Sequence, residues 1–444
     1  MKIRVNVLIE KSELPVWLEC YGVTHDQIGS KAWWKAVGIT GTPFVKQDNK
    51  QTSSVLFLWQ DPQGNEFESS TVGVLLDVNS LTDHHCWEPV CLGRVSGTDV
   101  WLGELQVDSS WRGSYSFIPI EKHQLPDLVR QAGDGSREAQ RVWWMSVAVN
   151  QISDPLNPLP ELISGWGMSS PLHLPLAKVE LGWEDWEAGR LELVDANQVL
   201  PLNWVSQDLG NQRDCRIFST SMAEAPLVIL LDGQKWDATS GTLSVLQYLT
   251  QVNEIAPAHY LLIPSIDGKT RWKELGCHRP FWQAVINDLL PQVEIRLANT
   301  GRSIKEYLVA GQSLGGLAAL HAGVTFPEYF SKVISLSGSF WWPEEDRMRT
   351  PNDTSSSHNW LENVPANSLA DQIINDQVSV SHLQVFLNVG SGEADMCLYN
   401  EATSQSIQQK GGRVHCEVVC GGHDWLSWRS GLVEGLRHLM PARS

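Results

Sequence analysis

The two halves of the chain differ in how apolar and polar residues alternate. After residue 190, short apolar runs such as Leu227-Val228-Ile229-Leu230-Leu231 alternate with longer stretches of helical periodicity. Such runs are typical of parallel strands buried on both faces, and their alternation with helices indicates a sheet covered by helices. The pattern predicts strands at residues 215–220, 226–231, 259–264, 306–310, 332–337, 384–389 and 414–419. It predicts helices at residues 242–251, 280–290, 314–324, 400–410 and 427–439.

The first half shows short strands separated by turn signals. Val55-Leu56-Phe57-Leu58-Trp59 is followed by Asp61-Pro62-Gln63-Gly64-Asn65 and then by an apolar stretch at residues 70–78, which predicts a β-hairpin. Strands are also predicted at residues 100–107 and 113–119, and a helix at residues 30–37. This spacing favours an all-β, immunoglobulin-like sandwich.

Residues 153–190 are rich in proline, which indicates an extended strap between domains. A chain of 444 residues is too long for one ordinary core. We therefore expect a β-sandwich domain with its connection over residues 1–190, and an α/β-hydrolase domain over residues 191–444.

Composition narrows the choice of partner and compartment. The net charge of −18 disfavours nucleic acid and anionic membranes, and an anionic ligand would need local basic side chains. The first 11 residues show no signal-peptide pattern, and no apolar run is long enough to span a membrane. The eight cysteines are too sparse for a disulfide scaffold, so we expect free thiols and a cytoplasmic protein. His84-His85-Cys86 is interpreted as a turn, since metal ligands at suitable spacing are missing.

The strongest chemical motif is Gly311-Gln312-Ser313-Leu314-Gly315, between a predicted strand and a predicted helix. This is the context of the G-x-S-x-G nucleophile elbow, in which small residues flank a strained serine. Ser313 is therefore the candidate nucleophile of an α/β hydrolase.

A serine hydroxyl needs an imidazole to accept its proton, and in this fold an acid and then a histidine follow the serine along the chain. His423, in Gly421-Gly422-His423-Asp424 after the last predicted strand, is the candidate base. Glu393 and Asp395 both follow the strand at residues 384–389, and position does not choose between them as the acid. Asp424 is a poor candidate, because it is adjacent to the base in sequence.

Two backbone N–H groups should stabilise the oxyanion. One belongs to Leu314, directly after the nucleophile, and the other to Gly233 or Gln234 in the loop after residues 226–231. Among the 21 tryptophans most should be core residues, and the pair Trp341-Trp342 is a candidate for an aromatic ligand site.

Several stretches resemble the enterochelin (enterobactin) esterases. They include Thr98-Asp99-Val100-Trp101, Trp111-Arg112-Gly113-Ser114-Tyr115, Asp154-Pro155-Leu156-Asn157-Pro158, Ser337-Gly338-Ser339-Phe340-Trp341-Trp342 and Gly421-Gly422-His423-Asp424. The likeness runs from about residue 54 to residue 440 and covers both expected domains. It implies a cytoplasmic serine esterase that cleaves the backbone esters of a ferric or free catecholate trilactone so that iron is released.

The resemblance also implies roles for individual residues. It makes Ser313 the nucleophile, His423 the base and Glu393 the acid, and it suggests that Arg271 holds catecholate oxygens, as a guanidinium fork can. It implies no cofactor and no metal site in the protein, since iron belongs to the substrate, and it sets no oligomeric state. One departure is Cys277-His278-Arg279, where the family usually has an asparagine, so the preferred siderophore stays open.

Two other hypotheses compete with this one. A carbohydrate or feruloyl serine esterase would keep the triad and use the sandwich as a sugar-binding module, and a secretion signal would favour it. A catalytically silent siderophore carrier would be favoured by loss of a triad residue, but Ser313, Glu393 and His423 are all present.

Overall fold

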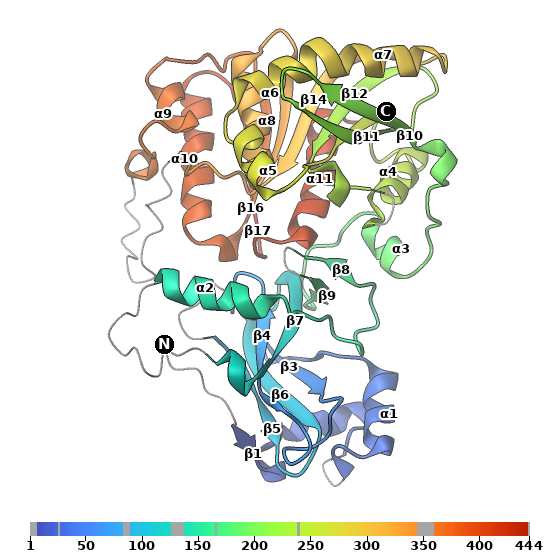
Figure 1. Ribbon diagram of the computed structural model, residues 1–444, viewed down its shortest axis with the longest axis vertical. Coiled ribbons are helices and arrows are strands. Elements are labelled where there is room, and N and C mark those ends of the chain that lie inside the picture. Colours follow the sequence, from blue (N-terminus) through green and yellow to red (C-terminus); the bar gives the residue numbers. More distant parts are fainter. Residues whose placement is uncertain are drawn as a thin grey trace. The chain divides into compact units, whose positions relative to one another are not determined.

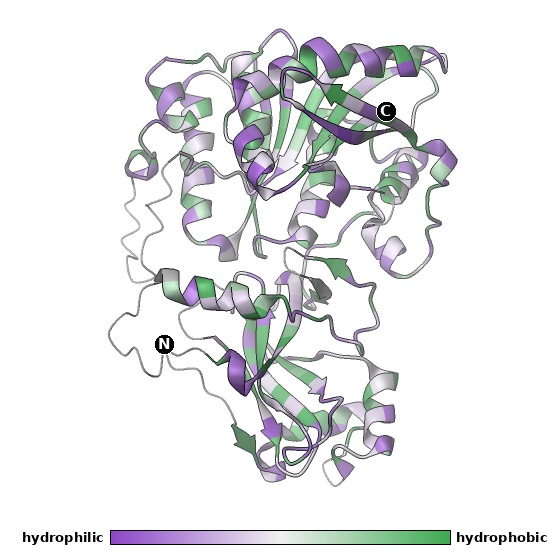
Figure 2. Ribbon diagram, in the orientation of Figure 1, coloured by the Kyte–Doolittle hydropathy of each residue, from purple (hydrophilic) through white to green (hydrophobic). Residues whose placement is uncertain are grey.

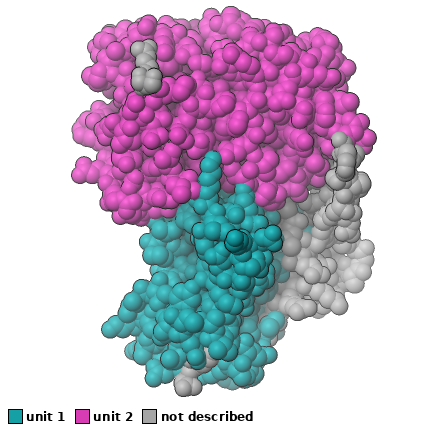
Figure 3. All heavy atoms as spheres, turned by 180° about the vertical axis from the view of Figure 1, so that it is seen from behind, with its two compact units in different colours: residues 1–178, 420–426 teal, residues 179–419, 427–444 magenta. Residues whose placement is uncertain are grey.

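The computed structural model describes residues 7–24, 27–82, 89–125, 137–164, 167–237, 240–343 and 359–442. The chain divides into two compact units, coloured separately in Figure 3: unit 1 comprises residues 1–178 and 420–426, and unit 2 comprises residues 179–419 and 427–444. The predicted turn His84-His85-Cys86 lies outside the described residues. Within these ranges, no helix is long and apolar enough to cross a membrane.

Unit 1 is built on strands hydrogen-bonded in the order β2-β3-β6-β5-β4-β7-β9-β8, with β1 paired to β5 (Figure 1). The strands are β1 (Leu8–Ile9), β2 (Phe44–Gln47), β3 (Thr52–Gln60), β4 (Thr71–Val78), β5 (Cys91–Val95), β6 (Val100–Asp108), β7 (Arg112–Glu121), β8 (Leu162–Ile163) and β9 (Met168–His173). The helices of unit 1 in the described ranges include α1 (Lys31–Thr40) and α2 (Arg137–Ala148).

Apolar residues of β3 and β6 share one buried core with those of β4, β7 and β9. The opposite face of β3 and β6 is covered by Trp33 and Trp34 of α1, and the opposite face of β4 and β7 by Trp143 and Trp144 of α2. These tryptophan pairs are therefore core residues, as expected from the large area that an indole buries.

The hairpin expected between residues 55–59 and 70–78 is wrong. Strand β3 pairs with β2 and β6, whereas β4 pairs with β5 and β7. The connection is instead organised by the buried Asp61, whose carboxylate accepts hydrogen bonds from the Gln63 N–H and the Ser69 hydroxyl. Asp61 also forms a buried ion pair with Arg94 (2.5 Å). The residues with turn signals therefore belong to a longer connection between two strands that do not pair, and not to a β-hairpin turn.

The proline-rich segment is only partly an extended connection. Its residues 168–173 form β9, which pairs antiparallel with β7, with His173 opposite Arg112. The segment continues in unit 2 as α3 (Trp183–Glu187).

Unit 2 contains an eight-stranded sheet in the order β10-β11-β13-β12-β14-β15-β16-β17. Its strands are β10 (Leu200–Ser206), β11 (Asn211–Ser219), β12 (Glu224–Leu231), β13 (His259–Ile263), β14 (Ser303–Gln312), β15 (Phe330–Leu336), β16 (Gln384–Gly390) and β17 (Arg413–Val419). The helices after α3 are α4 (Thr242–Gln251), α5 (Gly268–Leu275), α6 (Arg279–Ala284), α7 (Leu290–Ala298), α8 (Leu314–Thr325), α9 (Leu369–Ile374), α10 (Asp395–Gln409) and α11 (Trp425–Leu439), with a π-helical turn (Val285–Leu289) between α6 and α7.

Every strand predicted in this half is present, and strands β12 to β17 pair in parallel. The sheet is not wholly parallel, because β10 and β11 pair antiparallel at one edge. Strand β10 was not predicted from the sequence, and its alternating exposed and buried residues suit an edge strand.

The central strands are buried on both faces. Leu227 and Ile229 of β12 lie in a core cluster with residues of α6, α7 and α8, and Val228 and Leu230, which alternate with them along the strand, are also fully buried. On the second face, α11 approaches so closely that a Cβ on Gly435 would lie 2.8 Å from the Ile334 side chain of β15. Figure 2 shows these strands in the colour of hydrophobic residues. The layout is that expected of an α/β hydrolase.

Candidate active site

Ser313 lies between β14 and α8 with φ 57° and ψ −121°, a left-handed conformation that is costly for a residue with a Cβ. Its main chain is held by β15 and the segment after it. The Ser313 N–H donates to the Leu336 carbonyl (2.8 Å), and the Ser339 N–H donates to the Ser313 carbonyl (3.1 Å). The structure therefore gives Ser313 the strained conformation that the elbow motif predicts.

The flanking glycines contribute unequally to the elbow. A Cβ on Gly311 would lie 2.5 Å from the carbonyl carbon of Gly315, so strand and helix could not meet there with any other residue. A Cβ on Gly315 would instead find its nearest neighbour, the Asp232 carboxylate, at 3.4 Å. Gly316, outside the motif, is more confined, because its Cβ would lie 2.6 Å from the Ser335 hydroxyl.

Glu393 follows β16 and is 8% exposed. Its Oε1 accepts hydrogen bonds from the Gly390 N–H (2.7 Å) and from the Ser337 hydroxyl (2.6 Å). The next residue, Ala394, has φ 46°, so the backbone beside this carboxylate is strained. Asp395, the other candidate acid, is the first residue of α10 and is partly exposed.

Ser337 connects the elbow region to Glu393. It directly follows Leu336, the residue that accepts the Ser313 N–H, and its own N–H donates to the Asn388 carbonyl (2.6 Å). The Ser337 hydroxyl also accepts a hydrogen bond from Trp428 Nε1 (2.9 Å). Sequence reasoning missed this residue, although it opens the Ser337-Gly338-Ser339 motif.

The loop after β12 approaches the elbow. Trp236 Nε1 donates to Gln312 Oε1 (3.2 Å) and to the Leu231 carbonyl (3.1 Å), which connects the residue before Ser313 to this loop. A Cβ on Gly233 would lie 2.6 Å from the Ile263 nitrogen, and the Gln234 side chain accepts from the Ser265 N–H (2.9 Å). The candidate oxyanion loop is therefore fixed against β13.

Leu314 is the first residue of α8, where backbone N–H groups have no acceptor within the helix. Its N–H is therefore suited to the oxyanion role that the sequence predicts.

His423 lies in the segment 420–426, which belongs to unit 1, whereas Ser313 and Glu393 belong to unit 2. The His423 N–H donates to the Ser80 hydroxyl (2.9 Å). Asp424 is 2% exposed, and its carboxylate accepts the Ser114 N–H (2.8 Å) and the Leu426 N–H (2.8 Å). Asp424 is thus held by unit 1.

Arg271 of α5 forms a bidentate ion pair with Asp232, with Nη2 2.7 Å from Oδ2 and Nε 2.8 Å from Oδ1. Its side chain keeps 29% of its surface exposed, whereas that of Asp232 is 3% exposed. Lys235 lies near the same pair, and its pKa is lowered because burial, aided by Arg271, outweighs the attraction of Asp232. Two cations around one carboxylate make this part of an acidic protein locally basic.

Three tryptophans of unit 2 lie close together. They are Trp272, on the same helix as Arg271, and the predicted pair Trp341 and Trp342. The ring centroid of Trp272 lies 5.9 Å from that of Trp341 and 5.0 Å from that of Trp342. Trp272 is 41% exposed and follows Arg271 directly. The structure therefore places the predicted aromatic pair close to the helix that carries Arg271.

Comparison with known proteins covers nearly the whole chain. The family described as "Enterochelin esterase, N-terminal" matches residues 54–183, and the family described as "Putative esterase" matches residues 206–439. The iron(III) enterobactin esterase of Dickeya dadantii is 37% identical over 94% of this chain and 94% of its own length, and that of Escherichia coli is 34% identical over 93% and 97%. A crystal structure of the enterobactin esterase of Shigella flexneri in the presence of enterobactin is similar with a TM-score of 0.78, at 33% identity over 93% of this chain and 98% of that one.

This chain belongs to the enterobactin esterase family. The segment Cys277-His278-Arg279, where the resemblance led us to expect an asparagine, lies at the junction of α5 and α6, and Cys277 has φ 56°. Cys277 packs against the core of unit 2, and burial raises the pKa of its thiol to about 12. A thiol with that pKa is protonated and inert at neutral pH, so Cys277 contributes to packing and not to nucleophilic chemistry.

The same junction perturbs His321, on the helix that begins at the esterase elbow. His321 is 8% exposed, and burial, with a contribution from Arg279 and His278, lowers its pKa to about 4. Its Nδ1 has no hydrogen-bond partner among the described residues. His321 is therefore neutral in the folded protein at neutral pH.

This imidazole should make stability depend on pH. The folded-state pKa of His321 lies below the ordinary value of 6.5. The contribution of the neutral imidazole to folding stability is therefore complete above about pH 6.5 and is lost as the pH falls toward 4. The loss is about 1.4 kcal/mol per pH unit. The Tm of the wild type should fall more steeply between about pH 6.5 and 4.5 than that of His321→Leu. Parallel Tm curves would contradict this assignment.

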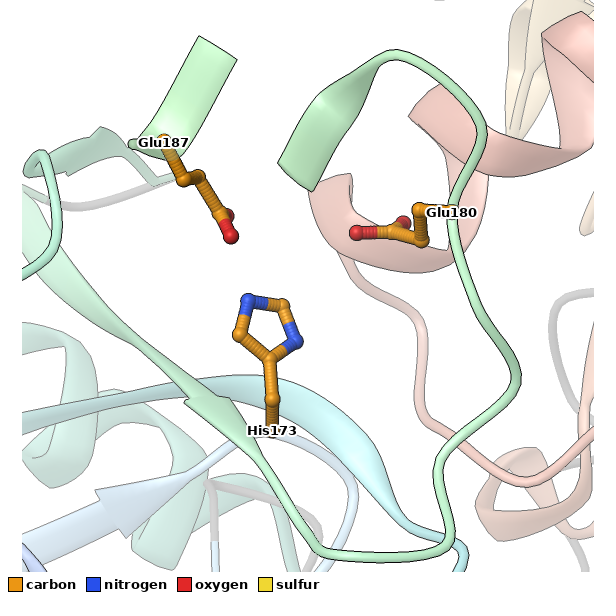
Figure 4. Close-up of side chains that lie close together, drawn as sticks. All are labelled: His173, Glu180 and Glu187. Carbon is orange, nitrogen blue, oxygen red and sulfur yellow. The ribbon is translucent and has the colours of Figure 1, made fainter. Parts of the chain in front are cut away.

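Figure 4 labels two acids of unit 2, Glu180 and Glu187. Both acids pair with the buried Arg429 of α11, with Nη2 2.5 Å from Glu180 Oε2 and 2.6 Å from Glu187 Oε1. The ring of Trp183 lies 4.5 Å from the same guanidinium. Within unit 1, His173 Nδ1 accepts a hydrogen bond from Arg112 Nε (3.0 Å). The two acids thus neutralise a buried arginine that fixes α3 to α11.

Proposed function

We propose that this protein is a serine esterase that hydrolyses the ester bonds of a catecholate trilactone siderophore such as enterobactin, in its ferric or free form. The observation that carries the proposal is the likeness to enterobactin esterases over both parts of the chain, including one crystallised in the presence of enterobactin. The strained Ser313 and the buried, hydrogen-bonded Glu393 support the chemistry.

In the proposed reaction His423 accepts the hydroxyl proton of Ser313 as the serine oxygen attacks an ester carbonyl. The N–H groups of Leu314 and of Gly233 or Gln234 stabilise the resulting oxyanion. As the carbon–oxygen bond of the ester breaks, His423 returns the proton to the departing serine oxygen of the siderophore. Glu393 orients the imidazole and stabilises its cation.

Water then completes the cycle. It attacks the acyl group on Ser313 and gives one proton to His423, which passes it to the Ser313 oxygen as the acyl bond breaks. The products are the free carboxylic acid and the restored enzyme. The iron travels with the substrate, and no resident cofactor takes part in these steps.

We propose that basic and aromatic side chains of unit 2 bind the siderophore. A ferric triscatecholate is an anion with flat rings, which suits the cations Arg271 and Lys235 and the indole faces of Trp341 and Trp342. Because Asp232 holds two nitrogens of Arg271, the guanidinium is fixed in direction while 29% of its side chain stays exposed. An ordered cation loses little entropy when a phenolate binds.

We further propose that unit 1 is the expected immunoglobulin-like sandwich domain and unit 2 the esterase domain, which would move the boundary expected near residue 190 to near residue 178. The core shared by β3 and β6 with β4, β7 and β9 supports two packed layers. A cytoplasmic location is also proposed, because the seven cysteines in the described ranges are all free, as in a reducing compartment.

The substrate proposal is tested by comparing ferric enterobactin, a feruloyl ester and a p-nitrophenyl ester as substrates of the wild-type protein. We expect kcat/KM for the siderophore to exceed that for either other ester by about 10²-fold or more, because only the siderophore offers both anionic and aromatic contacts. Product separation over time would follow the linear trimer and its fragments. Equal turnover of all three esters would contradict the substrate, and preference for the feruloyl ester would favour the carbohydrate esterase instead.

A further inference from the structure

The segment 420–426, here called the base loop, carries His423 between β17 and α11, yet it belongs to unit 1. By sequence it lies inside the match to the esterase family model. Residues more than 300 positions earlier in the chain therefore contact the loop that carries the proposed general base.

The main chain of the base loop is hydrogen-bonded to two places in unit 1. At the start of β7, the Arg112 N–H donates to the Cys420 carbonyl (2.9 Å), and Arg112 forms a parallel bridge with Gly421. In the turn after β4, the Ser80 hydroxyl accepts the N–H of His423 itself (2.9 Å). The backbone before His423 is thus fixed, and the backbone N–H of His423 is itself hydrogen-bonded.

Asp424 fixes the loop on the other side of His423. Its Oδ2 accepts both the N–H (2.8 Å) and the hydroxyl (2.5 Å) of Ser114, and its Oδ1 accepts the Leu426 N–H (2.8 Å). Asp424 is 2% exposed and Ser114 8%. Hydrogen bonds to an ionised carboxylate in such a buried place are strong and directional.

Close packing of the base loop against the turn after β4 adds to these hydrogen bonds. A Cβ on Gly422 would lie 2.7 Å from the Ser80 hydroxyl oxygen and 2.8 Å from the Asn79 carbonyl oxygen, so only glycine allows the loop to approach this turn. The turn is itself fixed, because the Thr82 hydroxyl accepts the Val78 N–H (2.8 Å) and donates to the Leu76 carbonyl (2.5 Å). A rigid turn is a suitable template for a loop that must hold one side chain in place.

We propose that Ser80, Ser114 and Asp424 are positioning residues, which hold the base loop so that His423 can take the proton of the nucleophile. The inference rests on the proposed role of His423 as general base. Proton transfer needs the imidazole within about 3 Å of the hydroxyl oxygen, and a displacement of about 1 Å can cost about 10²-fold in rate. The N-terminal unit therefore has a catalytic purpose besides any contact with substrate.

The test uses the full-length variants Asp424→Asn, Ser114→Ala and Ser80→Ala. With ferric enterobactin, we expect Asp424→Asn to lower kcat by about 10- to 100-fold with KM changed less than about twofold, and each serine variant to lower it by a smaller factor. Ser114→Thr keeps the hydroxyl and should recover most of the activity that Ser114→Ala loses. The matched control is Ser53→Ala, which removes a buried hydroxyl bonded to Ser109 (2.9 Å) in the same unit. It should lower Tm comparably and leave kcat unchanged.

A second readout separates this inference from the substrate proposal. A fluorophosphonate probe reacts with a serine activated by its base and needs no siderophore, so its rate of reaction with Ser313 reports on the base alone. Slower labelling of Asp424→Asn, with normal labelling of Ser53→Ala, supports the positioning role even if the siderophore is not the substrate. Labelling of Asp424→Asn at the wild-type rate, or an equal loss in Ser53→Ala, overturns it. Failure of the wild type to label at Ser313 would instead contradict the proposed function.

Discussion

Replacement of Ser313 by alanine is expected to lower kcat for ferric enterobactin by about 10⁴- to 10⁶-fold, because the acyl-enzyme route is lost. Binding should survive, since it is proposed to depend on Arg271, Lys235 and the indoles and not on this hydroxyl. Quenching of tryptophan fluorescence by the ferric complex would measure that binding, and separation of hydrolysis products would measure the rate.

The matched control for this prediction is Ser335→Ala. Ser335 is a fully buried serine on β15, and its hydroxyl has no hydrogen-bond partner among the described residues. Removing that hydroxyl should change kcat less than about threefold. Siderophore hydrolysis by Ser313→Ala at a rate near that of the wild type would show that another residue is the nucleophile.

Replacement of Glu393 by glutamine is expected to lower kcat by about 10³- to 10⁴-fold, because an amide keeps the shape of the carboxylate but not the charge that stabilises an imidazolium. The amide oxygen can still accept the Gly390 N–H and the Ser337 hydroxyl, so Tm should change little. KM should be nearly constant, since Glu393 makes no proposed contact with substrate.

Asp395→Asn is the paired variant, because position in the sequence alone leaves both acids open. Asp395 is partly exposed at the first turn of α10, and among the described residues its carboxylate makes none of the buried hydrogen bonds that Glu393 makes. We expect its kcat within about threefold of the wild type. A larger loss for Asp395→Asn than for Glu393→Gln would exchange the roles of the two residues.

The strands of unit 2 could be predicted because burial on both faces leaves continuous apolar runs, as at Leu227-Val228-Ile229-Leu230-Leu231. The elbow could be predicted because the close approach of Gly311 and Gly315 permits no side chain on Gly311. Local sequence is sufficient in both cases, since the constraint acts within the segment itself.

The predictions from sequence failed where residues far apart in the chain determine the local structure. The turn signals at Asp61-Pro62-Gln63-Gly64-Asn65 were interpreted as a hairpin, but Arg94 and Ser69 bind Asp61 and direct the chain to another neighbour. The partners of Glu393 could not be foreseen either, because Ser337 lies 56 positions away. The contact between Asp424 and Ser114 spans 310 positions, and no local pattern indicates it.

The central claim is that the siderophore becomes bound to Ser313 during turnover, and acid quenching within milliseconds followed by mass spectrometry of the protein tests it most directly. Opening a cyclic trilactone leaves the departing alcohol attached to the acyl group, so the predicted adduct carries the whole siderophore on the peptide that contains Ser313. An adduct on another residue, or no adduct at any quench time while products accumulate, would contradict the account.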